Sequence, residues 1–194
     1  MLATAALAAA LLLVAAYADG SSISLIAGIL GLAACGSSAA YALDEFAVAV
    51  ADASPTSRTR RLAWRMLTVV TPALVASVGL LALDHLAPAM HWLRLAPFAA
   101  GALAIGVCLA AALRRRGWST PGDLAGMLAF STIVITVVLD PLHRWVAIAP
   151  LGDTAHPGRS TLLWVVVIAT CLAMTFICAR DPGRPRAHRH SRRC

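Results

Sequence analysis

The stretch "SISLIAGILGLAACGSSAAYAL", residues 22–43, contains no charged residue and consists mostly of Ala, Leu, Ile and Gly. The hydrocarbon core of a bilayer, about 30 Å thick, is crossed by roughly 20 apolar residues in a helix. A backbone inside lipid has no water to bond, and a helix satisfies its N–H and C=O groups internally. The stretch therefore predicts a membrane-spanning helix.

Small residues recur along this stretch at Ala27, Gly31 and Cys35. Residues four positions apart lie on the same face of a helix, and small side chains let a second helix approach closely. We therefore predict a helix-packing surface at these three positions. The sequence leaves open whether it contacts another helix of the same bundle or a partner protein.

The rest of the chain has the same apolar character. Of its 194 residues, 60% are hydrophobic and 13% are charged, whereas soluble domains average about 45–50% apolar and about 25% charged residues. We expect an all-α polytopic membrane protein, a bundle of six transmembrane helices over residues 1–180, followed by a basic cytoplasmic tail, 181–194. The predicted spans are 2–18, 22–43, 63–83, 95–113, 123–139 and 161–179.

The first apolar run has one alternative interpretation. "AYA" at 16–18, before Asp19, has the small-residue pattern of a signal-peptidase site. No basic residue precedes the run, as a signal peptide would require. We therefore interpret residues 2–18 as the first span.

The basic residues predict the orientation of the bundle. All 16 are Arg, and an N-terminus in the cytoplasm would place thirteen of them in inner segments and only Arg94, Arg144 and Arg159 in outer ones. Cytoplasmic loops of membrane proteins carry the excess of basic residues. We expect both termini in the cytoplasm and the chain in a bacterial plasma membrane, with the inner arginines attracting anionic lipids.

Several function classes are disfavoured by the same sequence. The net charge of +7 lies in loops between spans, so we do not expect binding to nucleic acid. The five cysteines form no CxxC pair, and no phosphate-binding GxxxxGK[ST] loop is present. Charged residues are absent from the middle of every predicted span, where ion-coupled transporters carry them. We expect no enzyme activity, cofactor or metal in this chain.

Residues 44–53, between the second and third spans, predict a short amphipathic helix on the cytoplasmic side. Asp44, Glu45 and Asp52 would share one face, opposite Phe46 and Val50. Acidic residues at the start suit the helix dipole. Such a helix either rests on the membrane surface or docks to a cytoplasmic partner.

The layout resembles a known family. Six spans, the acid-led helix, "ASPTSRTRR" entering span three, "RRRGWSTPGD" after span four and "ARDPGRPR" closing span six are similar to the permease subunits of actinobacterial ABC exporters of the six-helix ABC-2 type. The resemblance implies a separate cytoplasmic ATPase subunit and a second membrane subunit, identical or related. By position, it implies that Asp44, Glu45, Phe46, Val50 and Asp52 dock to the ATPase, and that part of 140–160 forms a re-entrant segment.

Two other functions stay open. A non-transporting accessory or assembly subunit of a larger complex would also be this apolar. A membrane-embedded enzyme acting on lipid would need acids gathered at one interface, and only Asp44, Glu45, Asp52 and Asp123 are available on the inner side. For the permease, we expect a hydrophobic or amphiphilic substrate.

The tryptophans near the span ends, Trp64, Trp92, Trp118 and Trp145, occupy positions typical of interface anchors. Trp side chains are enriched where a bilayer meets water. We therefore expect them to lie at the rim of the bundle.

Overall fold

A computed structural model describes residues 2–18, 22–41, 69–86, 91–118, 120–139, 148 and 157–179. Every regular element within these residues is helical, which confirms the predicted all-α class for the described part of the chain. The elements are α1 (Leu2–Tyr17), α2 (Ser22–Ala40), α5 (Val70–Leu86), the 3-10 helix η4 (Trp92–Leu95), α6 (Ala96–Arg115), α7 (Pro121–Leu139) and α8 (Pro157–Ala179). The predicted docking segment 44–53 and the basic tail 181–194 lie outside the described residues.

Prolines mark the starts of four helices. Pro121 and Pro157 are the first residues of α7 and α8, Pro97 is the second residue of α6, and Pro72 lies in the first turn of α5. The first turn of a helix leaves its N–H groups unbonded, so the missing N–H of proline costs nothing there. Proline thus fixes where these apolar runs become helical and produces no kink in their interiors.

The end of α6 is a Schellman motif. Gly117 has a φ of +95°, a conformation that glycine adopts without steric cost. The Gly117 N–H donates to the carbonyl of Arg114 at 3.0 Å, and the Trp118 N–H donates to that of Leu113 at 3.3 Å. These bonds satisfy carbonyls that the helix end would leave unpaired. The helix therefore stops at the arginine run.

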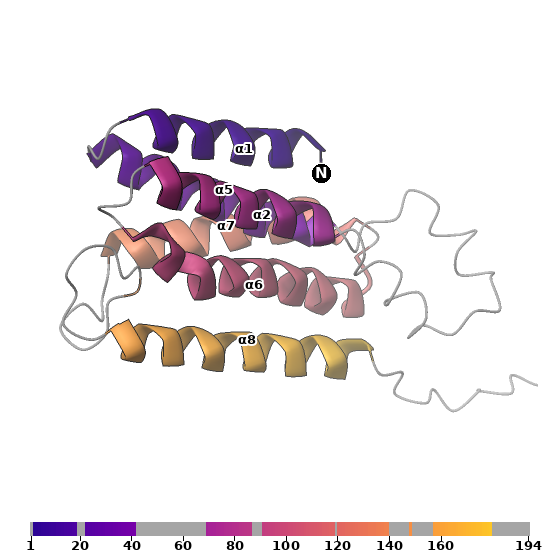
Figure 1. The fold of residues 1–194 in the computed structure, drawn as a ribbon. Helices are drawn as coiled ribbons and strands as arrows, with labels where there is room; N and C mark the ends of the chain where they lie inside the picture. Colours follow the sequence, from indigo (N-terminus) through magenta and orange to yellow (C-terminus); the bar gives the residue numbers. More distant parts are fainter. Residues whose placement is uncertain are drawn as a thin grey trace, which may run out of the picture.

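Helix α2 lies at the centre of the bundle. It packs against α1, α5, α6 and α7, whereas α8 packs mainly against α6. In Figure 1, α1 and α8 accordingly form opposite edges of the bundle. The central position of α2 agrees with its burial, since Leu32, Ala33 and Ala39 are fully buried.

Contacts between the helices define their relative directions. Ser24, near the start of α2, donates from Oγ to the carbonyl of Ala15, near the end of α1, at 2.7 Å. Gly28 of α2 meets Trp92 just before α6, and Gly36 meets Ala102 further along α6. Hence α1 and α2 are antiparallel, whereas α2 and α6 are parallel, as expected when consecutive helices alternate in direction.

Two of the tryptophans are core residues. Trp92 is fully buried, and a Cβ atom placed on Gly28 would lie 2.5 Å from its ring. The ring of Trp164 stacks edge-on against Phe98, with centroids 5.0 Å apart, and its Nε1 donates to the Ile148 carbonyl at 2.8 Å. The expectation that Trp92 anchors the rim is therefore wrong, because the absent side chain of Gly28 opens a place for the indole inside the bundle.

The described helices differ in their suitability for crossing a membrane. Four are long and apolar enough by length and composition, within Ile23–Ala40, Trp92–Arg115, Pro121–Val138 and Gly158–Cys178. The other two, α1 with 16 residues and α5 with 17, measure about 24–26 Å at 1.5 Å per residue. Many large apolar side chains are exposed, such as Val138, Leu162 and Leu172, as expected of a protein surrounded by hydrocarbon.

Candidate functional site

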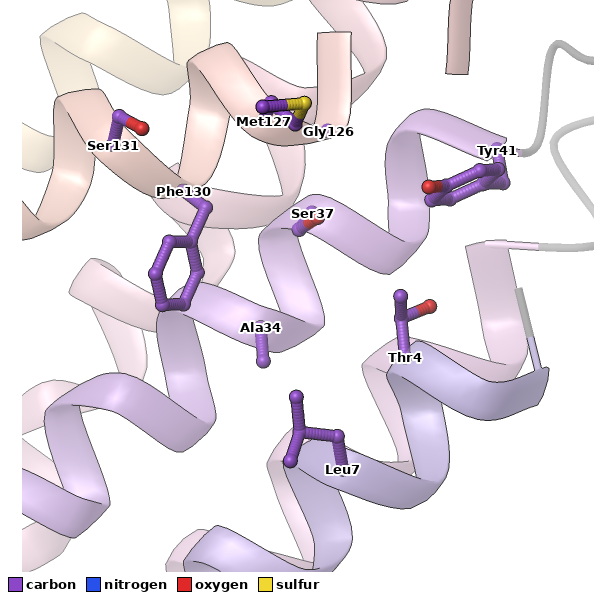
Figure 2. Close-up of a pocket in the computed structure, with 9 residues that line it drawn as sticks. All are labelled: Thr4, Leu7, Ala34, Ser37, Tyr41, Gly126, Met127, Phe130 and Ser131. Atoms are coloured by element: carbon purple, nitrogen blue, oxygen red, sulfur yellow. The ribbon is translucent and has the colours of Figure 1, made fainter. Parts of the chain in front are cut away.

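A groove lies between α1, α2 and α7, with a volume of about 340 Å³. Small-molecule sites in proteins have volumes of about 300–1,000 Å³, so the groove is at the lower end of that range. Of the described residues that line it, four carry hydroxyl groups, none is charged, and the others are apolar or glycine. Figure 2 shows the lining residues, which are Thr4, Leu7, Ala34, Ser37, Tyr41, Gly126, Met127, Phe130 and Ser131.

The groove has a polar mouth and a more apolar interior. Thr4 lies at the start of α1, and Ser37 and Tyr41 lie in the last turn of α2 and directly after it. One helical turn deeper, α1 contributes Leu7 and α2 contributes Ala34, with Phe130 facing them from α7 (Figure 2). Because side chains three or four positions apart share a helix face, the change from polar to apolar follows directly from the sequences of the helices.

Glycine at position 126 keeps the mouth of the groove open. A Cβ atom on Gly126 would lie 2.9 Å from the Ser37 Oγ and 3.4 Å from the Tyr41 ring. A larger residue would therefore displace the serine hydroxyl. The absence of a side chain at Gly126 lets α7 approach the end of α2 while Ser37 keeps its place in the groove.

The groove opens toward the outer surface of the bundle. Leu7 is 55% exposed and Met127 is 70% exposed, although both are large apolar residues. On a protein embedded in a bilayer, this surface would face hydrocarbon chains, so an apolar molecule could enter from the side. Ser131 is also exposed, and it is the hydroxyl that α7 contributes to the described lining of the groove.

Most other hydroxyls in the middle of the helices are used within their own helix. Ser77, Thr136, Thr170 and Thr175 each donate to the backbone carbonyl four residues earlier, at 2.6–2.8 Å. Such bonds satisfy a polar group in an apolar environment without a ligand. These four residues therefore have a structural explanation, whereas Ser37 and Ser131 lie on the groove.

A second polar cluster lies between α6 and α8. The side chains of Cys108 on α6 and Cys171 on α8 lie near each other, with Cys178 and Thr175 close by. All four cysteines of the described residues are free thiols. Among those residues, no group of three or more His, Cys, Asp or Glu side chains is placed to hold a metal ion.

The predicted site residues divide into described and undescribed ones. Ala27 and Cys35 are buried on α2, and a Cβ atom on Gly31 would lie 2.8 Å from the side chain of Leu12 on α1. At Gly31, therefore, this surface packs within the bundle. The expected docking residues lie outside the described part of the chain; they are Asp44, Glu45, Phe46, Val50 and Asp52.

The groove itself was not predicted from the sequence. Its hydroxyls come from α1, from the end of α2 and from α7, which is distant from both along the chain, so only the tertiary arrangement brings them together. The sequence did contain one relevant signal, because Ser37 and Gly36 interrupt the run of Ala and Leu near the end of α2.

Comparison with known proteins gave no match, since no family model fits the sequence and no curated protein or solved structure resembles it significantly.

Proposed function

We propose that the chain is the membrane permease subunit of an ABC-type exporter, which moves a hydrophobic or amphiphilic substrate with energy from a separate ATPase. One observation supports the proposal most directly. Tyr41 lines the groove at the end of α2, and the expected docking segment begins three residues later, at Asp44. A motor that pulls on this segment would act directly on a wall of the groove.

The proposal places six helices across a bacterial plasma membrane. The four longer helices are long enough to cross the hydrocarbon core of a bilayer. The two shorter ones can be accommodated by local thinning of the bilayer. The antiparallel pair α1 and α2 and the parallel pair α2 and α6, which are separated in the chain by α5, agree with one crossing per helix. The excess of arginine at one end, including the exposed Arg115 and Arg116, favours that end as cytoplasmic.

The energy for transport would come from outside the chain. The sequence contains no GxxxxGK[ST] loop for nucleotide. The buried polar residues of the described helices are Ser24, Ser38, Ser160 and Thr175, and none of them is ionisable at neutral pH. Since the sequence lacks this motif and the buried polar residues of the described helices are not ionisable, we infer that a coupled partner supplies the energy.

Coupling would act through the movement of α2. Helices that alternate between two arrangements can present a site first to one side of a membrane and then to the other. Since α2 contacts α1 and α7, a displacement of its last turn would change the distance between all three walls. A second membrane subunit, identical or related, would complete the transporter. Anionic lipids would bind at the inner arginines.

The accessory subunit stays the second candidate, because of the close contact between α2 and α6. A Cβ atom on Gly106 would overlap the Gly36 carbonyl oxygen, so no passage separates these helices. A bundle that closed at its centre would serve as an assembly component, with the groove holding a structural lipid. No described cluster of acids or histidines gives comparable support to a lipid-modifying enzyme.

Purification of the full-length protein in mild detergent tests the proposal. We expect a P-loop ATPase to copurify, and we expect the double variant Phe46→Ala, Val50→Ala to lose it while still inserting into the membrane. Ser57→Ala, in the same predicted loop, is the matched control. Copurification with a large complex that contains no ATPase would favour the accessory subunit. Retention of an ATPase by the double variant would refute docking at this segment.

A further inference from the structure

We propose that the groove between α1, α2 and α7 binds a neutral amphiphile with one hydrocarbon chain and a hydroxyl-bearing headgroup. The molecule would enter sideways from the membrane. This inference names the ligand class of the site described above, and its role as transport substrate rests on the proposed function. Binding itself follows from the lining of the groove.

The mouth of the groove selects an uncharged polar headgroup. Thr4, Ser37 and Tyr41 offer hydroxyls, each of which can donate one hydrogen bond and accept others. No charged side chain is among the described residues that line the groove, and a charge held in an apolar site without a partner carries a large desolvation penalty. A carboxylate or a quaternary ammonium would therefore bind less well than an alcohol with the same chain.

The interior of the groove is mostly apolar, with the Ser131 hydroxyl at its exposed side, and it matches a hydrocarbon chain. Leu7, Ala34 and Phe130 lie one helical turn beyond the mouth, and they offer apolar surface along the direction of the helices (Figure 2). The headgroup would then lie near the membrane surface while the chain runs toward the bilayer centre. This is the orientation that the same molecule has in a bilayer, so entry requires no inversion.

Size and exposure limit the ligand further. A volume of about 340 Å³ lies at the lower end of the range of small-molecule sites, which favours one chain over two. Leu7 and Met127 are exposed on the outer surface beside the groove. A single chain can thus pass between α1 and α7 from the surrounding hydrocarbon.

Photolabelling of the full-length protein in phospholipid nanodiscs tests this inference. The probe is a long-chain alcohol that carries a photoactivatable diazirine in its chain. We expect cross-links to residues 4–7, 34–41 and 126–131. We also expect an unlabelled alcohol to compete more strongly than a carboxylate or trimethylammonium of equal chain length, because a charged headgroup would lose part of its hydration and meet no charged partner among the described lining residues.

Two variants probe the two parts of the groove. Ser131→Phe fills the interior from an exposed position and should abolish labelling, whereas Thr170→Phe, at an exposed position on α8, should leave it unchanged. Thr4 and Tyr41 have interactions of their own, so the headgroup test uses Ser37. Ser37→Ala should lower the affinity for the alcohol about two- to tenfold, which is the range of one hydrogen bond. Ser77→Ala should leave this affinity unchanged.

The outcomes separate this inference from the transport proposal. Labelling needs no ATPase, so labelled groove peptides without a copurifying ATPase would support the ligand class and reject the exporter. A copurifying ATPase with labels scattered over the lipid-facing helices would support the exporter and reject the proposed ligand class. Equal competition by charged and neutral chains, or undiminished labelling of Ser131→Phe, would overturn the inference.

Discussion

The carbonyl oxygen of Gly36 on α2 occupies the space that a Cβ atom on Gly106 of α6 would need. The relationship is nearly reciprocal, since a Cβ atom on Gly36 would lie 2.6 Å from the Ala102 carbonyl oxygen. The two helices therefore touch through their backbones. Close backbone contact is how membrane helices associate when apolar side chains gain nothing by leaving lipid.

The first prediction concerns this crossing. Alanine at a free helical position is more stable than glycine by about 1 kcal/mol, yet Gly106→Ala should lower stability by about 1–3 kcal/mol because it overpacks the contact. The control is Gly158→Ala on α8, where an added Cβ would meet nothing within 4 Å. Thermal unfolding in detergent measures both. A Gly106→Ala protein as stable as the unaltered chain would mean that α2 and α6 do not touch here.

The second prediction concerns Leu12 of α1, which lies between two glycines. A Cβ atom on Gly31 would approach its side chain to 2.8 Å, and one on Gly79 of α5 to 2.5 Å. Leu12→Ala would leave a cavity between three helices and should lower the free energy of unfolding by about 2–5 kcal/mol. Leu13→Ala, at a position 58% exposed, should cost much less. If an unfolding titration showed that Leu12→Ala and Leu13→Ala lower the free energy of unfolding equally, this packing would be contradicted.

The third prediction uses the thiol pair between α6 and α8. Oxidation of membranes with copper phenanthroline should join Cys108 to Cys171, because the two side chains lie near each other where α6 packs against α8. Each disulfide releases two protons and passes two electrons to the oxidant. Mass spectrometry of digested protein would identify the linked peptides, and Cys108→Ser should remove them. Cross-links from Cys35 of α2 to either residue would show a different arrangement of the helices.

The sequence predicted the described helices well where a long apolar run was the only feature needed. The runs at 22–43 and 123–139 correspond to α2 (Ser22–Ala40) and α7 (Pro121–Leu139), since an uninterrupted apolar run in lipid has no alternative to a helix. The third span was expected to end at 83, but α5 continues to Leu86 and includes Asp84. The Leu93 N–H donates to the Asp84 carboxylate at 3.4 Å, a tertiary contact that no hydropathy pattern contains.

The burial of Trp92 and the groove could not be predicted for a related reason. Both depend on glycines that permit close approach in one helix, Gly28 for Trp92 and Gly126 for the groove. A sequence shows that a glycine is present, but the residue that fills the space is known only when the neighbouring helix is placed. The docking helix, inferred from its amphipathic pattern and the family resemblance, the count of six spans, inferred from apolar runs, and their orientation, inferred from the arginines, stay predictions.

The orientation of the bundle is the central claim, because an ATPase can act on residues 44–53 only if they face the cytoplasm. Single cysteines at Ser57, Ser191 and Gly158, in a chain otherwise free of cysteine, would be treated with a membrane-impermeant maleimide in intact cells. We predict that Gly158→Cys is labelled at once, whereas Ser57→Cys and Ser191→Cys react only after the membrane is permeabilised. Labelling of Ser57→Cys in intact cells would place the docking segment outside and contradict the account.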